Sequence, residues 1–181
     1  MAKVYIYFKN KENPSLINYL ESLNDTENFN VEKNYYTFEI KEMYIEEYTN
    51  ILNNIEFDFF EKLPSFINTS KFEGKILSEI LGLLKNRRSG VNTLSDILKE
   101  SILKNNEDVK HLFKEYFSSK LNPEIIETGL TFVECENVIE ASKKLYIHRN
   151  TLLYRLDQIE KKTSLNLKNF IDKLVFYGIM S

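Results

Sequence analysis

The stretch NVIEASKKLYIHRNTLLYRLDQIEKKT, residues 137–163, decides how the C-terminal part of the chain folds. It opens with Asn137 and, three residues later, Glu140, the pair that forms a capping box at the start of a helix. The helical pattern that follows can run only to about Leu145, because a second one occupies about residues 148–162. A short helix joined by three residues to a longer one predicts a helix-turn-helix.

The small and apolar side chains of this stretch predict how its two helices pack. Ala141 and Ser142 leave room for the helices to approach closely, and His148 occupies the N-cap position of the second helix. With the apolar side turned inward, the polar residues of the second helix face outward. The side chains expected inside are Leu145, Ile147, Leu152, Leu156 and Ile159.

The outward face carries side chains that suit duplex DNA. Arg149 and Asn150 fall in the first turn, the part of a recognition helix that usually meets base edges. Arginine can bridge the O6 and N7 atoms of guanine, and asparagine can bridge the N6 and N7 atoms of adenine. Hydroxyl groups and lysines suit phosphate oxygens. The predicted DNA-binding residues are Asn137, Lys143, Lys144, His148, Arg149, Asn150, Thr151, Leu153, Tyr154 and Arg155.

Charge is distributed unevenly along the chain, whose formal net charge is −3. From residue 137 to residue 181 there are eight Lys or Arg residues and four Asp or Glu residues, which gives +4. The preceding 136 residues then carry −7. A basic end on an acidic body indicates a polyanionic partner for the C-terminal module alone.

Each polar residue of the second helix, taken singly, also fits an ordinary solvated helix face. Arg149 and Lys161 need no ligand to explain them on an exposed helix. The short connection, the contact between small residues and the basic C-terminal end favour DNA when they are taken together.

The residues just described resemble a known family. The string HRNTLLYRL, residues 148–156, is similar to the distinctive core of the C-terminal helix-turn-helix of PucR-type regulators, which include purine-catabolism and carbohydrate-diacid regulators. The resemblance covers about residues 122–176, roughly a third of the chain, and implies a DNA-binding fold. Two positions depart from the family pattern: Ser142 replaces the second residue of an Ala-Ala pair, and Ser164 replaces a glycine after the recognition helix.

The resemblance does not extend to the first 120 residues. Family members usually carry a long sensor region and a diguanylate-cyclase-like middle domain, and no motif of either occurs here. Residues 4–8 and 35–40 read as strands, with helices after Pro14 and before Pro64 and a polar loop at residues 25–34. Residues 1–65 therefore predict a small β-α-β-α unit, a candidate domain for an unidentified small-molecule effector or a protein partner.

Residues 66–121 are expected to be wholly helical. Three apolar stripes at helical spacing occur there, and Gly90 is expected to stop the first of the helices. Their apolar content favours a dimerisation segment, so a homodimer is expected. Asn122 as N-cap and Pro123 at the first helical position then begin the C-terminal domain, residues 122–181. The fold class predicted is mostly α, of the α+β kind.

Composition argues against several classes of protein. The single Cys135 excludes an intramolecular disulfide, and with two histidines and no metal-ligand spacing we expect no metal and no cofactor. No nucleophile with an adjacent base and no phosphate loop occurs, so we do not expect an enzyme. No apolar stretch approaches the ~20 residues of a membrane span. We therefore expect a cytoplasmic protein of bacterial type that does not bind a membrane.

Two functions from different classes remain open at this point. The first is a transcription regulator that binds double-stranded DNA through its C-terminal module, as a homodimer. The second is an interaction protein that does not bind DNA but forms homodimers or heterodimers and modulates longer regulators. The acidic body and the missing sensor region favour the second, whereas the helix-turn-helix and its outward side chains favour the first.

Overall fold

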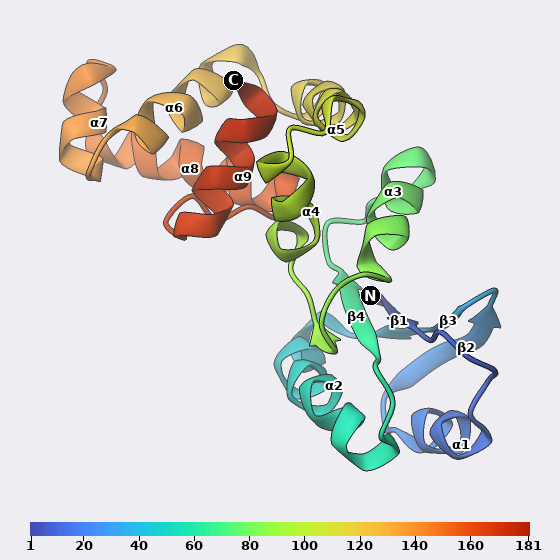
Figure 1. The fold of residues 1–181 in the computed structure, drawn as a ribbon. Helices are drawn as coiled ribbons and strands as arrows, with labels where there is room; N and C mark the ends of the chain where they lie inside the picture. Colours follow the sequence, from blue (N-terminus) through green and yellow to red (C-terminus); the bar gives the residue numbers. More distant parts are fainter. The chain divides into compact units, whose positions relative to one another are not determined.

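The computed structural model describes residues 1–181, which form two compact units, Met1–Thr93 and Leu94–Ser181 (Figure 1). The fold is mostly α, and its one small sheet lies in the first unit, so the predicted fold class is confirmed. The units divide at Thr93, whereas the sequence suggested boundaries after residues 65 and 121. A membrane crossing would need a longer and more apolar helix than any in this structure.

The first unit is built on a five-stranded sheet with the order β2-β3-β1-β4-β5. Neighbours among the first four strands are antiparallel, and β5 is parallel to β4. Two helices and the first four strands follow one another as β-α-β-β-α-β, the ferredoxin-like split βαβ arrangement. The elements are β1 (Ala2–Tyr7), α1 (Pro14–Ser22), β2 (Thr26–Glu32), β3 (Tyr35–Ile40), α2 (Ile45–Phe59), β4 (Pro64–Asn68) and β5 (Gly90–Val91), with a 3₁₀ turn at Glu42–Tyr44.

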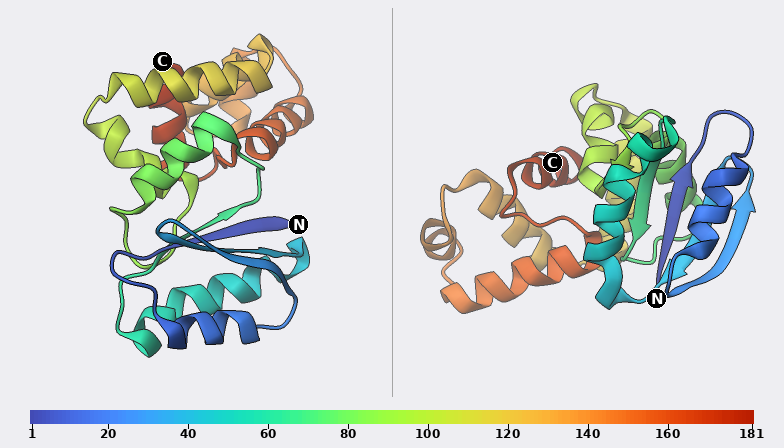
Figure 2. Two further views of the ribbon diagram at one scale, coloured as in Figure 1. Left: turned by 90° about the vertical axis from the view of Figure 1, so that its right-hand side faces the viewer. Right: turned by 90° about the horizontal axis from the view of Figure 1, so that it is seen from below.

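The core of the first unit lies between one face of the sheet and the helices α1 and α2. Because side chains alternate along a strand, Val4 and Ile6 of β1 both point to this face. Leu16 of α1 and Leu52 of α2 are buried against it. The left view of Figure 2 shows these two helices on one side of the sheet and α3 (Gly74–Leu84) on the other.

The opposite face of the sheet carries tyrosines from β1 and β3. The hydroxyl of Tyr35 donates a hydrogen bond of 2.6 Å to the carbonyl of Leu81, which ties α3 to the sheet. Burial, helped by the neighbouring Tyr7, raises the pKa of Tyr35 to about 12. Tyr35 therefore stays a neutral donor at every physiological pH.

Three strands occur where the sequence indicated a loop or helices. Residues 25–34 were expected to form a loop, but Thr26–Glu32 form the edge strand β2, which is mostly exposed and interrupted by a bulge between Glu27 and Asn30. An exposed, bulged edge lacks a clean apolar alternation, so local pattern could not reveal it. Strand β4 is a short, fully buried run, which periodicity cannot distinguish from a helix segment.

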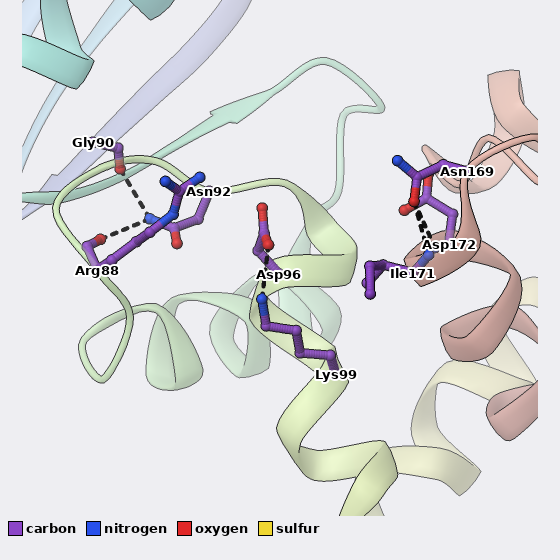
Figure 3. A network of polar contacts seen from close by, with 8 residues as sticks. All are labelled: Arg88, Gly90, Asn92, Asp96, Lys99, Asn169, Ile171 and Asp172. Carbon is purple, nitrogen blue, oxygen red and sulfur yellow. Dashed lines mark hydrogen bonds and ion pairs between the residues drawn. The ribbon is translucent and has the colours of Figure 1, made fainter.

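The prediction that Gly90 stops a helix is wrong: α3 already ends at Leu84, and Gly90 begins β5. Its φ of +80° is a left-handed conformation, and a Cβ atom there would lie 2.5 Å from Oδ1 of Asn53. The same oxygen accepts a hydrogen bond from the Val91 amide at 2.9 Å. The Asn92 side chain closes this turn by donating to the carbonyls of Arg88 and Gly90, each at 2.9 Å (Figure 3).

The second unit consists of helices that pack around α9 and α6. Helix α9 contacts α4, α5 and α6, and α6 also contacts α7 and α8. Asn169 caps the start of α9, and Lys99 pairs with Asp96 on α4 at 3.0 Å (Figure 3). The helices are α4 (Leu94–Leu103), α5 (Glu107–Lys120), α6 (Pro123–Glu134), α7 (Val138–Lys144), α8 (Arg149–Thr163) and α9 (Phe170–Met180).

The segment expected to mediate dimerisation, residues 66–121, is divided between the two units. Helix α3 belongs to the first unit, whereas α4 and α5 pack within the second. Phe113 and Phe117 of α5 are fully buried, with ring centroids 6.0 Å apart. The apolar stripes of α4 and α5 are thus covered inside a single copy and do not call for a partner.

Helices α6, α8 and α9 meet at Gly129. A Cβ atom at this position would lie 2.6 Å from Cε1 of Phe176 on α9 and 2.9 Å from Cδ1 of Ile159 on α8. Helix α6 begins as predicted, with Asn122 as its cap and Pro123 at its first position. Cys135 is buried where α6 ends, and burial raises the pKa of its thiol, which is the opposite of what a reactive cysteine needs.

Candidate nucleic-acid interface

The first helix of the helix-turn-helix, α7, begins at a capping box built by the predicted residues. Oδ1 of Asn137 accepts hydrogen bonds from the amides of Ile139 and Glu140, both at 3.0 Å. The Glu140 carboxylate reaches back to the amide of Glu136 at 2.8 Å, one residue earlier than in the usual box. Asn137 therefore fixes the position of α7 through its side-chain oxygen.

The turn between the two helices is a Schellman motif centred on Tyr146. The Tyr146 amide donates to the carbonyl of Lys143 at 3.2 Å, and the Ile147 amide donates to the carbonyl of Ser142 at 3.0 Å. Tyr146 has a φ of +53°, a position that glycine usually fills, and its side chain is 96% exposed. Tyr146 is not among the residues predicted to bind DNA, yet its exposed ring lies three residues before the first residue of α8.

Helix α8 occupies the range predicted for the second helix, with His148 as its N-cap. Nδ1 of His148 accepts a hydrogen bond of 3.2 Å from the amide of Asn150. Leu152, Leu156 and Ile159 are all buried, so the predicted inner face is confirmed. Ser164 takes the left-handed conformation itself, with φ +60°, and so ends the helix without the glycine that the family pattern leads one to expect.

The first turn of α8 presents its polar side chains to the surface. Arg149, Asn150 and Thr151 are exposed, and none of their side chains makes a hydrogen bond or an ion pair with the rest of the protein. One turn later, the side chain of Tyr154 is 62% exposed, and that of the preceding residue, Leu153, is half-buried. These residues form one free face at the N-terminal end of α8.

Arg155 lies apart from this face, on the side of α8 that meets α6. Its Nη2 is 2.7 Å from a carboxylate oxygen of Glu124, and its Nη1 donates to the Thr128 hydroxyl at 3.1 Å. Thr128 is fully buried, and only about a fifth of the Arg155 side chain is exposed. The guanidinium of Arg155 therefore has its partners on α6, within the same unit. It does not lie beside the other residues predicted to bind DNA.

The two lysines that end α7 differ in their surroundings. Lys143 is exposed and belongs to no ion pair. Nζ of Lys144 is 2.8 Å from Oε2 of Glu134, and this carboxylate raises the pKa of Lys144. Lys161, farther along the outer side of α8, is paired with Asp157 at the same distance. Part of the positive charge near α8 is thus already matched by carboxylates of the same unit.

The comparisons with known proteins concern this part of the chain. Residues 125–177 match the family model of the PucR C-terminal helix-turn-helix domain. The chain is also 54% identical over 39 residues to the carbohydrate diacid regulator of Escherichia coli (strain K12). That alignment covers 22% of this chain and 10% of the regulator's length. No solved structure matches the chain. Its C-terminal part, residues 125–177, is thus a PucR-type helix-turn-helix domain.

Proposed function

We propose that the chain is a DNA-binding transcription regulator that reads duplex DNA with α8 as its recognition helix. The observation that carries the proposal is the free face in the first turn of α8. Arg149 and Asn150 stand there exposed and unpartnered, while the opposite side of the same helix is fully packed. The carbohydrate diacid regulator is a relative over 39 residues, and its name as a regulator supports the same function.

Each free group has a role that its chemistry supports. Arg149 is suited to the O6 and N7 atoms of guanine, and Asn150 to the N6 and N7 atoms of adenine. The hydroxyls of Thr151 and Tyr154 and the ammonium of Lys143 suit phosphate oxygens, which position a protein without reading sequence. We add Tyr146 to this second group because its exposed hydroxyl-bearing ring flanks the start of the recognition helix.

We further propose that two copies bind one operator. Helix-turn-helix proteins usually bind two half-sites about one helical turn of DNA apart, which requires a pair of recognition helices related by two-fold symmetry. The apolar stripes of α4 and α5 no longer support a dimer, because they are buried within one copy. The proposal of a homodimer therefore rests on the symmetry of DNA recognition.

An interaction protein that modulates longer regulators is the second candidate. The ion pair between Lys144 and Glu134 favours it, because a carboxylate already occupies the place that a phosphate would take. The acidic first 136 residues favour it as well, since their charge of −7 repels DNA.

A selection of bound sequences from random duplex DNA tests the proposal and separates it from the second candidate. The full chain is incubated with the duplex library at about 50 mM and 200 mM salt, and bound duplexes are sequenced after several rounds. A regulator enriches one motif with two related half-sites, and its binding weakens steeply with salt. Recovery of unrelated sequences at both salt concentrations would instead support the interaction protein.

A further inference from the structure

A basic pocket lies at one end of the sheet in the first unit, far along the chain from the helix-turn-helix. Its volume is about 310 Å³, at the lower end of the range that holds small organic ligands. Three separate segments contribute to it: the end of β1 and the residues after it, the start of β4, and the residues that follow α3. The lining residues are Tyr7, Lys9, Lys62, Pro64, Lys85 and Asn86.

The lining is positively charged and offers donors without partners. Lys9, Lys62 and Lys85 are exposed, and none of them forms an ion pair with a carboxylate. No Asp or Glu lines the pocket. The side-chain amide of Asn86 is likewise not engaged in a hydrogen bond within the protein. Like charges brought together repel each other, so an anion in the pocket would relieve this repulsion and receive several hydrogen bonds.

The kind of donor indicates the kind of anion. Lysine binds phosphate as a compact point charge with three donors, and it does not need the planar, bidentate geometry that the arginine fork offers to carboxylates and phosphates alike. Three ammonium groups and one amide can surround the tetrahedral oxygens of a phosphate group. Tyr7 and the buried Pro64 supply an aromatic and an aliphatic wall for an uncharged organic part.

We propose that this pocket binds the phosphate monoester of a small organic molecule. The inference stands on the first unit alone and does not depend on whether α8 binds DNA. It gives residues 1–93 a ligand of defined chemistry.

Isothermal titration calorimetry on the full chain tests the proposal with ribose 5-phosphate as the probe. Ribose without phosphate and succinate, a dicarboxylate of similar charge, are titrated in parallel. We expect saturable binding of ribose 5-phosphate with a Kd in the range of micromolar to about 1 mM, no binding of ribose, and weaker binding of succinate. Lys62→Gln and Lys85→Gln should each weaken binding about tenfold, because each removes a full charge from the lining.

Two control variants remove the same charge elsewhere. The first is Lys11→Gln, because Lys11 lies in the loop after β1 but does not line the pocket. The second is Lys143→Gln, because Lys143 lies just before α8, far along the chain from the pocket. Both should leave the Kd for ribose 5-phosphate unchanged. Equal weakening by these controls would show a diffuse charge effect and overturn the proposal, as would the absence of any binding at 10-millimolar probe. Tighter binding of succinate than of ribose 5-phosphate would overturn the assignment to phosphate.

Discussion

At the scale of single residues, Tyr146 combines a strained backbone with a fully exposed aromatic ring. A non-glycine residue in the left-handed region costs about 1 kcal/mol or more, so Tyr146→Gly should raise the melting temperature of the domain. The same change removes a ring that we place against the DNA backbone, so it should weaken DNA binding. Thermal unfolding and fluorescence anisotropy with labelled duplex measure the two effects. A variant that is more stable and binds equally well would remove Tyr146 from the interface.

We propose that Glu134 competes with DNA phosphate for Lys144, because the two side chains form an ion pair of 2.8 Å. Glu134→Gln should free the ammonium group of Lys144 and strengthen DNA binding at low salt.

Lys144→Ala should weaken DNA binding about equally for all sequences and lower the slope of log K against log salt by roughly one unit per protomer. Glu127→Gln, an exposed carboxylate on the same helix without an ion pair, is the matched control. If Glu134→Gln and this control behave alike, the pair has no bearing on DNA binding.

At the scale of elements, Arg155 joins α8 to α6 through Glu124 and Thr128, and we propose that this is its role rather than a contact with DNA. Arg155→Ala should lower the free energy of unfolding by about 1 kcal/mol or less, since its pair with Glu124 is largely exposed on the carboxylate side. The base preference of the protein should not change. Arg149→Ala should show the reverse, with unchanged stability and altered base preference. Chemical denaturation and sequence selection on both variants give the comparison, and a relaxed base preference in Arg155→Ala would return this residue to the interface.

The elements that could be predicted are those whose signals lie within a few residues of one another. The Asn137 capping box, the Asn122-Pro123 helix start and the buried stripe of α8 are local patterns, and the structure contains all three. Strand pairing and ion pairing are not local. Strand β4 pairs with β1 across some sixty residues of chain, and Glu124 meets Arg155 across 31 positions. Neither partner can be identified from spacing, so the sequence predicts helix where β4 forms and does not reveal that Arg155 pairs with Glu124. The contact of Arg155 with DNA stays a prediction.

At the scale of the whole molecule, the proposed binding of an operator requires two copies of the chain. We expect two chains of 21.5 kDa on each duplex that carries both half-sites. Sedimentation of the complex with a selected duplex measures this mass, and a duplex with one half-site scrambled serves as the control. One chain bound to the intact site, with no loss on scrambling, would rule out the paired arrangement.

The most direct test of the central claim is a titration of the selected duplex with wild type, Arg149→Ala and Asn150→Ala at two salt concentrations. The acidic body leaves little non-specific attraction to mask the result. Each substitution should cost about 1–3 kcal/mol at the preferred site and relax the choice of base at one position in each half-site. Neither should reduce the salt dependence, in contrast to the reduction expected for Lys144→Ala. Wild-type protein that binds no duplex even at low salt, or variants that bind it as wild type does, would contradict recognition of DNA by α8.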